Sequence, residues 1–273
     1  MIKLSHTIEI GTVRVCLLCP SVFWAKLIKT NYAPYLISAK IKRPDAVVLL
    51  DPSALKAEKT GKVTVSSTGG KTSISRSDFD LISNDGLTRA VLRCAKNKYS
   101  FDSWLRVFLT LLGLKKSSVL VHASGLHVNK SVFLFPGVSG SGKSSITRIF
   151  GRRNALSDEI VMLQAGKNVN AASTPFWGEL KKGTGHIFNS GLRGVFFIKH
   201  GKKLSAARLT PGQALKKLLS TVLFFSKESA HVKKLLALAA RISGAVPAYD
   251  LSFSLNVKRN ELIKFLKERY GQI

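Results

Sequence analysis

Residues 137–144, Gly-Val-Ser-Gly-Ser-Gly-Lys-Ser, match the pattern G-x-x-x-x-G-K-[ST] of a phosphate-binding loop. Glycines let such a loop curl so that successive backbone N–H groups point at phosphate oxygens, and the following helix adds its positive N-terminal end. Lys143 can neutralise the β- and γ-phosphates of a nucleotide, and the Ser144 hydroxyl can ligate Mg²⁺. An apolar run, Val132–Phe135, precedes the loop, and a helix-compatible run, Ser144–Phe150, follows it. The expected ATP-binding residues are Gly137, Val138, Ser139, Gly140, Ser141, Gly142, Lys143, Ser144 and Ser145.

Two adjacent acidic residues follow the loop closely, in a part of the chain that is poor in them. Only eight Asp and Glu residues occur in residues 99–273, and Asp158 and Glu159 lie 15 and 16 residues after Lys143. If the strand that they enter pairs beside the strand of the loop, Asp158 comes close to the γ-phosphate. A carboxylate there can orient or deprotonate an attacking hydroxyl, or hold magnesium through water. The alternative is a pair of turn charges that offset the neighbouring arginines at 152 and 153.

Two further residues are candidates for the same site. His122 lies in Leu120–Ser124, just before the loop strand, and could pair with Asp158 if the two strands are neighbours. A purely structural strand histidine is the alternative. Glu179 ends the aromatic and glycine-containing segment Pro175–Glu179, which could close over a substrate or supply another magnesium ligand.

The elements that must position these residues predict a mixed α/β (α+β) fold, with a nucleotide-binding domain over residues 98–273. A helix is expected over Phe101–Leu114, followed by strands at Ser118–Val128 and Ser131–Phe135 that flank a tight turn. The later expected elements are strands at Ala155–Leu163 and Leu192–Lys199, helices at Gly212–Phe224 and Glu228–Ile242, a strand at Val246–Phe253 and a helix at Arg259–Arg269.

Residues 1–97 predict a separate, strand-rich N-terminal region without a chemical motif. Short runs rich in Val, Ile and Thr, such as Thr7–Leu18 and Ala46–Leu50, alternate with turn signals such as Gly69-Gly70. Cys16 and Cys19 fall in the apolar run Val13–Cys19, and we interpret them as buried strand residues because no second cysteine pair completes a zinc site.

The net charge of +28 is the most unusual global property of the chain. Such a field attracts anions, including nucleotides and acidic peptides, although an effect on solubility alone is the alternative. We find no nucleic-acid recognition motif and do not expect nucleic acid as a partner. The sequence shows no signal peptide and no apolar run of the roughly 18 residues that cross a bilayer, so we expect no membrane span and a cytoplasmic protein.

Three segments together resemble the catalytic core of the HPr kinase/phosphorylase superfamily, whose fold is shared with ATP-type phosphoenolpyruvate carboxykinase. They are Val121-His-Ala-Ser124, the loop at 137–144 and Leu156-Ser-Asp-Glu159. Thr174–Glu179, Val195–Gly201 and Val246–Phe253 resemble segments of the HPr-kinase-like relatives found beside peptide-modification genes. The most specific feature of this resemblance is the short sequence separation between the loop lysine and the acidic pair. The resemblance covers roughly residues 99–255.

The resemblance implies a function and a role for each residue. It implies an ATP- and Mg²⁺-dependent kinase that phosphorylates a serine of a peptide or protein, with relatives that form hexamers. Asp158 would accept the serine proton with His122 as its partner, and Lys143 would hold phosphate. Ser144, Glu159 and Glu179 are the candidate magnesium ligands. There are two alternatives. One is a carboxykinase-like or small-molecule kinase, and the other is a non-catalytic nucleotide-binding module with a basic partner-binding surface.

Overall fold

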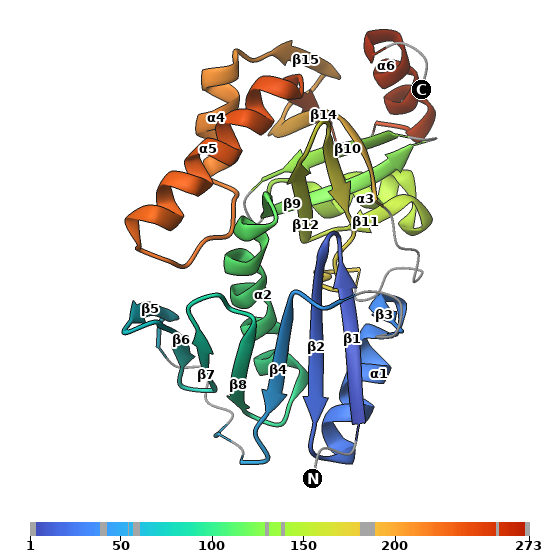
Figure 1. Cartoon of the computed structure of the whole chain (residues 1–273). Coiled ribbons are helices and arrows are strands. Elements are labelled where there is room, and N and C mark those ends of the chain that lie inside the picture. The colour runs from blue at the N-terminus through green and yellow to red at the C-terminus, as the bar shows by residue number, and fades with distance from the viewer. Residues whose placement is uncertain are drawn as a thin grey trace. The chain divides into compact units, whose positions relative to one another are not determined.

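The protein is described by a computed structural model over residues 4–38, 43–53, 55–56, 61–128, 131–137, 140–180, 189–254 and 257–270. The chain forms two compact units (Figure 1). One comprises Met1–Lys116 and Phe224–Lys234, and the other Ser117–Leu223 and Leu235–Ile273. The helix with which the expected nucleotide-binding domain begins belongs to the first of these units.

An eight-stranded mixed sheet forms the first unit, in the order β3-β1-β2-β4-β8-β7-β6-β5. A two-residue turn joins β5 to β6, and its Gly69 and Gly70 have φ of 59° and 72°, which suits the twist of paired strands. The single strand expected over Thr7–Leu18 is wrong, because the chain reverses at Gly11, where φ is 59°. The strands are β1 (Leu4–Ile10), β2 (Val13–Cys19), β3 (Leu36–Ile37), β4 (Ala46–Leu50), β5 (Thr64–Thr68), β6 (Lys71–Arg76), β7 (Phe79–Asn84) and β8 (Arg89–Cys94).

Helices α1 (Val22–Tyr32) and α2 (Lys98–Lys115) complete the first unit, with a 3₁₀ turn, η1 (Ala33–Tyr35). Asn97 caps α2, because its side chain accepts a hydrogen bond from the Ser100 backbone N–H at 2.9 Å. The two helices meet through aromatic rings, with the Trp24 and Phe101 centroids 5.8 Å apart. The expectation of buried strand cysteines is confirmed in β2, where Cys16 and Cys19 are both buried.

Strands of the second unit pair in the order β10-β9-β12-β13-β14-β16-β15, and β10 also pairs with β14. The pairings from β10 through β9, β12, β13 and β14 therefore return to β10 and form a closed ring. The strands are β9 (Ser118–Val128), β10 (Ser131–Pro136), β11 (Ala155–Ser157), β12 (Ile160–Ala165), β13 (Val169–Ala172), β14 (Asn189–His200), β15 (Ser205–Arg208) and β16 (Ala248–Phe253). The single strand expected over Ala155–Leu163 is wrong, because the chain breaks between β11 and β12 at the acidic pair.

The helices of the second unit pack against this sheet. Helix α3 (Lys143–Phe150) follows β10, and its Ile146 and Phe150 join a buried cluster with Phe133, Phe135 and Phe196. A Thr210–Gln213 capping box begins α4 (Pro211–Leu219), which ends earlier than expected. The remaining elements are η2 (Arg152–Asn154), α5 (Ser229–Ala245) and α6 (Arg259–Tyr270), and residues of α5 up to Lys234 belong to the first unit.

The expected α/β class is confirmed, since both units combine mixed sheets with helices. Within the described ranges, no helix is both long enough and apolar enough to cross a membrane.

Candidate functional site

The glycine-rich loop joins the end of β10 to the start of α3. Gly140 and Gly142 have φ of 80° and 99°, a region that side chains other than glycine rarely adopt. Gly137 is required for a different reason, since a Cβ there would lie 2.2 Å from Oγ of Ser141. The backbone N–H of Gly137 bonds to the carbonyl of His122 at 3.3 Å, which ties the loop to β9. Val138 and Ser139 lie outside the described residues.

Lys143 is the first residue of α3, and only 6% of its surface is exposed. Its Nζ donates a hydrogen bond to the Gly137 carbonyl at 2.8 Å, so the side chain folds back over the loop. Burial lowers the pKa of Lys143, and the carboxylates of Glu159, Asp158 and Glu179 oppose that shift. The ammonium group therefore lies in the field of every acidic residue predicted for the site.

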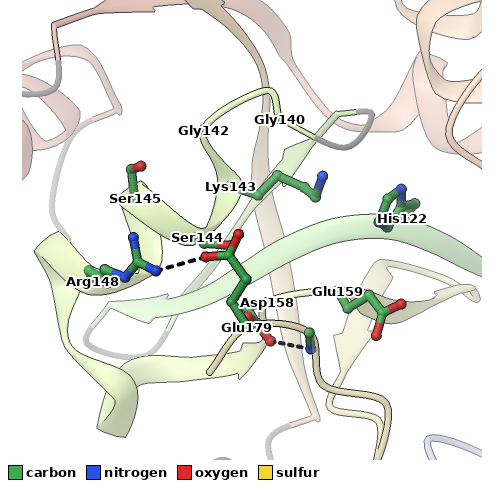
Figure 2. A pocket seen from close by; sticks show the side chains of 11 residues that line it. His122, Gly140, Gly142, Lys143, Ser144, Ser145, Arg148, Asp158, Glu159 and Glu179 are labelled. Carbon is green, nitrogen blue, oxygen red and sulfur yellow. Dashed lines mark hydrogen bonds and ion pairs between the residues drawn. The ribbon is translucent and has the colours of Figure 1, made fainter. Parts of the chain in front are cut away.

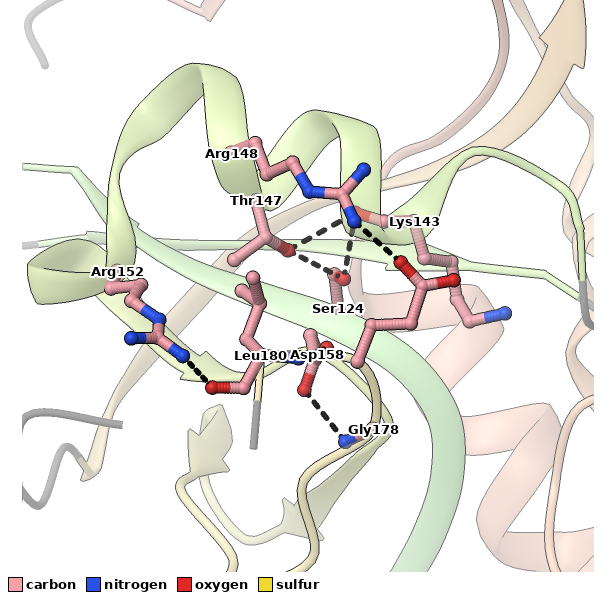
Figure 3. A network of polar contacts seen from close by, with 9 residues as sticks. Ser124, Lys143, Thr147, Arg148, Arg152, Asp158, Gly178 and Leu180 are labelled. Atoms are coloured by element: carbon pink, nitrogen blue, oxygen red, sulfur yellow. Dashed lines mark hydrogen bonds and ion pairs between the residues drawn. The ribbon is translucent and has the colours of Figure 1, made fainter. Parts of the chain in front are cut away.

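A buried hydroxyl pair fixes the helix that carries Lys143 to strand β9. Oγ of Ser124 lies 2.8 Å from Oγ1 of Thr147, and both side chains are fully buried. Both hydroxyl oxygens also lie within hydrogen-bond distance of the Lys143 carbonyl, at 3.1 Å for Ser124 and 3.0 Å for Thr147, and their two hydrogens can fill two of these three contacts at a time (Figure 3). The first turn of α3 is thus anchored by side chains as well as by its own backbone bonds.

Ser157 shapes the break between β11 and β12 at which the acidic pair lies. Its Oγ accepts hydrogen bonds from the backbone N–H groups of Glu159 and Ile160, at 3.0 and 3.1 Å. The same hydroxyl donates to the Phe176 carbonyl at 2.6 Å. A serine two residues before the N–H that it accepts forms a local turn that competes with strand pairing. The strand therefore stops, and Asp158 is directed away from the ladder.

Asp158 holds the segment that follows Phe176. Only 3% of its surface is exposed. Oδ1 accepts a hydrogen bond from the Gly178 N–H at 2.9 Å, and Oδ2 accepts one from the Leu180 N–H at 3.0 Å. Arg152 donates to the Leu180 carbonyl from the opposite side (Figure 3). Glu179, between the two anchored residues, is fixed at its backbone although its side chain is exposed.

Glu179 reaches helix α3 by an ion pair. Its Oε2 lies 2.7 Å from Nη2 of Arg148, and the two side chains are 64% and 60% exposed. An ion pair with this exposure contributes little to stability. Its importance is geometric, since it sets a carboxylate and a guanidinium at the edge of the glycine-rich loop (Figure 2).

These residues line one cavity of about 380 Å³ inside the second unit (Figure 2). The structure thus brings together nearly all of the predicted site residues that it describes. The lining residues are His122, Gly140, Gly142, Lys143, Ser144, Ser145, Arg148, Asp158, Glu159, Gly178 and Glu179.

His122 lies in β9, and the expected neighbourhood of the β9 and β10 strands is confirmed. The expectation that the strand after Asp158 pairs beside the loop strand is wrong. β12 pairs with β9, where Ile160 lies opposite His122, so β9 separates β12 from β10. Asp158 directs both oxygens at the 178–180 backbone, and His122 lies apart from that carboxylate in Figure 2. Both residues nevertheless line the cavity.

The oxygen donors of the cavity fit magnesium brought by a nucleotide. Ser144, Glu159 and Glu179 supply hydroxyl and carboxylate oxygens, the ligands that Mg²⁺ prefers. Among the described residues, however, no three His, Cys, Asp or Glu side chains converge closely enough to hold a metal ion by themselves. Mg²⁺ usually keeps several waters and binds through one or two carboxylates together with substrate phosphates. The donor set therefore suits a nucleotide-bound ion.

Sequence reasoning missed two lining residues, Arg148 and Gly178. Arg148 had a usable signal, since it follows Ser144 by four residues and so shares its helix face. For Gly178 the backbone N–H is the functional group, and no residue-type pattern identifies that. No protein-family model matches this chain, and no curated protein sequence matches it.

Proposed function

We propose that the protein is a kinase that transfers the γ-phosphoryl group of ATP to a serine hydroxyl of a peptide or protein. One observation carries the proposal. A glycine-rich loop with a buried lysine, and carboxylates from two separate segments, line a single cavity within one unit. Loop and lysine can hold phosphates, and the acids can serve a metal and a nucleophile.

Each residue is proposed for a role that its position allows. The loop N–H groups and Lys143 hold the β- and γ-phosphates, and Ser144 with Glu159 and Glu179 face the magnesium that accompanies them. Bound Mg²⁺ neutralises charge on the phosphates. Asp158 accepts the serine proton as the serine oxygen bonds to the γ-phosphorus and the bond from that phosphorus to the β–γ bridging oxygen breaks, so that ADP leaves. Each Asp158 oxygen accepts one described N–H bond, and a carboxylate oxygen has room for another.

His122 and Arg148 complete the proposed site. Both side chains line the cavity. The guanidinium of Arg148 can approach phosphate oxygens once its ion pair with Glu179 opens. A peptide or protein acceptor is proposed from the resemblance to HPr-kinase-like enzymes, and the charge of +28 favours an acidic one.

Transfer of labelled phosphate from ATP to a pool of serine-containing peptides, in the presence of Mg²⁺, tests the proposal. We expect phosphoserine with the wild type, and none with Lys143→Ala or Asp158→Asn. Asp158→Asn should retain nucleotide binding, because it leaves the phosphate loop intact. Lys167→Ala, in the exposed β12–β13 turn, is the matched control and should behave as the wild type.

Other outcomes identify the alternatives. If the wild type binds ATP but transfers phosphate to no acceptor, and Asp158→Asn behaves in the same way, the protein is a non-catalytic nucleotide-binding module. Transfer to small hydroxyl compounds or carboxylates in place of peptides would establish a small-molecule or carboxykinase-like enzyme.

A further inference from the structure

The sheet of the first unit has one covered face and one open face. Along β4, Val48 and Leu50 are fully buried, whereas Val47 and Leu49 are partly exposed. Successive strand residues point to opposite faces, so these two pairs define the two sides of the sheet. Helices α1 and α2 contact each other and both contact β2, so they cover the same side.

Four apolar residues form a continuous row across the open face. The strand register sets Leu18 beside Leu49, Leu49 beside Val91, and Val91 beside Ile82. Ile82 is 53% exposed and Val91 is 43% exposed, among the most exposed large apolar residues in the described ranges. With Val47 they line a shallow groove of about 670 Å³. Contiguous exposed apolar patches on soluble proteins are often functional, and many mark sites where another molecule binds.

Cations flank this apolar row on one side. The next row across the strands contains Val47, Arg89, Asn84 and Lys71. Arg89 and Lys71 are both exposed, and two strand spacings separate them, about 10 Å. Among its described lining residues the groove has these two cations and no carboxylate. On the other flank, Arg93 is already neutralised by Asp80 at 2.8 Å.

Charge argues against a second copy of the chain as the occupant. A two-fold contact through this face would bring Lys71 and Arg89 towards their own equivalents, between molecules that each carry +28. Like charges across an interface disfavour association, whereas carboxylates on a partner would be attracted. β4 and β8 each have strands on both sides, so an occupant of the groove meets side chains and not a free strand edge.

We propose that this face binds an extended segment of another polypeptide that carries apolar side chains together with carboxylates. The segment lies across the strands, with its apolar side chains on the row from Leu18 to Ile82. Its carboxylates face Arg89 and Lys71. The site is separate from the phosphate-loop cavity and requires no nucleotide, so it does not depend on the proposed kinase activity.

Selection from a displayed library of random dodecapeptides, with the full-length protein immobilised, tests this proposal. Enriched peptides should combine Leu, Ile, Val or Phe with Asp or Glu, and should bind in the absence of ATP and Mg²⁺. Synthetic copies should bind the variants Val91→Thr/Ile82→Thr and Arg89→Glu/Lys71→Glu roughly tenfold more weakly or worse. Leu4→Ser is the matched control, since Leu4 is 41% exposed on the opposite face of the same sheet. Circular dichroism melting curves check that each variant is folded.

Three outcomes would overturn the proposal. The first is no enrichment of peptides over the starting library. The second is that the selected peptides bind Val91→Thr/Ile82→Thr as tightly as the wild type. The third is that the enriched peptides carry no acidic residues. A wild-type dimer that Val91→Thr/Ile82→Thr dissociates, measured by light scattering, would instead assign the face to self-association.

Discussion

Oδ1 of Asp158 accepts a hydrogen bond from the backbone N–H of Gly178 at 2.9 Å, across 20 residues of sequence. The second oxygen accepts from Leu180 at 3.0 Å. Glu179 lies between these anchors and pairs with Arg148 of the helix that follows the glycine-rich loop. One buried carboxylate therefore connects the acidic turn to the segment that brings a second carboxylate to the cavity. Asp158 positions Glu179 in addition to the role of base that we propose for it.

Replacing Asp158 by Asn should release this segment. An amide has one acceptor and one donor group, so it can satisfy only one of the two N–H groups. We expect hydrogen exchange at the Gly178 and Leu180 amides to accelerate roughly tenfold or more. NMR or mass spectrometry of amide exchange measures this without any turnover. Glu179→Gln keeps both backbone bonds and should leave exchange at these amides unchanged, and equal exchange in Asp158→Asn and the wild type would refute the positioning role.

Gly137→Ala should disrupt the glycine-rich loop by a steric clash. The added Cβ would lie 2.2 Å from Oγ and 2.9 Å from Cβ of Ser141, so the loop must shift. We expect affinity for a fluorescent ATP analogue to fall roughly tenfold or more.

The second substitution Ser141→Gly removes both clashing atoms and should restore much of that affinity. Ser141→Gly alone is the control for loop flexibility. If the double variant binds as weakly as Gly137→Ala, the clash is not the cause of the loss.

Ser124→Ala and Thr147→Val should each destabilise the second unit by about 1–2 kcal/mol, since each breaks a buried hydroxyl contact. Both hydroxyls contact each other and the same Lys143 carbonyl, so the effects should not be additive. We expect a coupling energy of about 0.5 kcal/mol or more from a double-mutant cycle. Urea unfolding measures it, and strictly additive losses would show that the two hydroxyls act independently.

Cys94 should make stability decrease at alkaline pH. Burial raises the pKa of its thiol from 9.0 to about 12, and that of Cys19 to about 11. Above pH 9 the unfolded thiols ionise while the folded ones stay protonated, so the folded state binds more protons and loses stability as pH rises. The stabilising contribution is complete below pH 9 and declines above it.

The measurement is the free energy of unfolding of the wild type and Cys94→Ala, at intervals from about pH 8 to pH 10.5. The cavity left by Ala adds an offset that does not depend on pH, and lysine titration is common to both proteins. The stability difference between wild type and variant should therefore shrink above pH 9. A difference that stays constant across this range would contradict the prediction.

Local features of the candidate site could be predicted from the sequence because their causes are local. The curl of the loop depends on glycines at fixed spacing, and helix α3 must begin where Lys143 follows Gly142. The mixed α/β class likewise follows from hydrophobic periodicity over short windows. The turn at Ser157 was not predicted, because a serine whose hydroxyl accepts from the backbone N–H two residues on resembles an ordinary strand residue in the sequence.

Residue types and spacing in the sequence identified the glycine-rich loop, the acidic pair and the candidate residues His122 and Glu179. Only the tertiary structure decided which strand lies between β10 and β12, and that Asp158 binds the Gly178 and Leu180 backbone. It alone decided which face of the first sheet is covered, since the apolar run of β4 has no polar residue to mark a face. Strand order, and pairings across some 20 residues, depend on long-range packing that no short window of sequence contains.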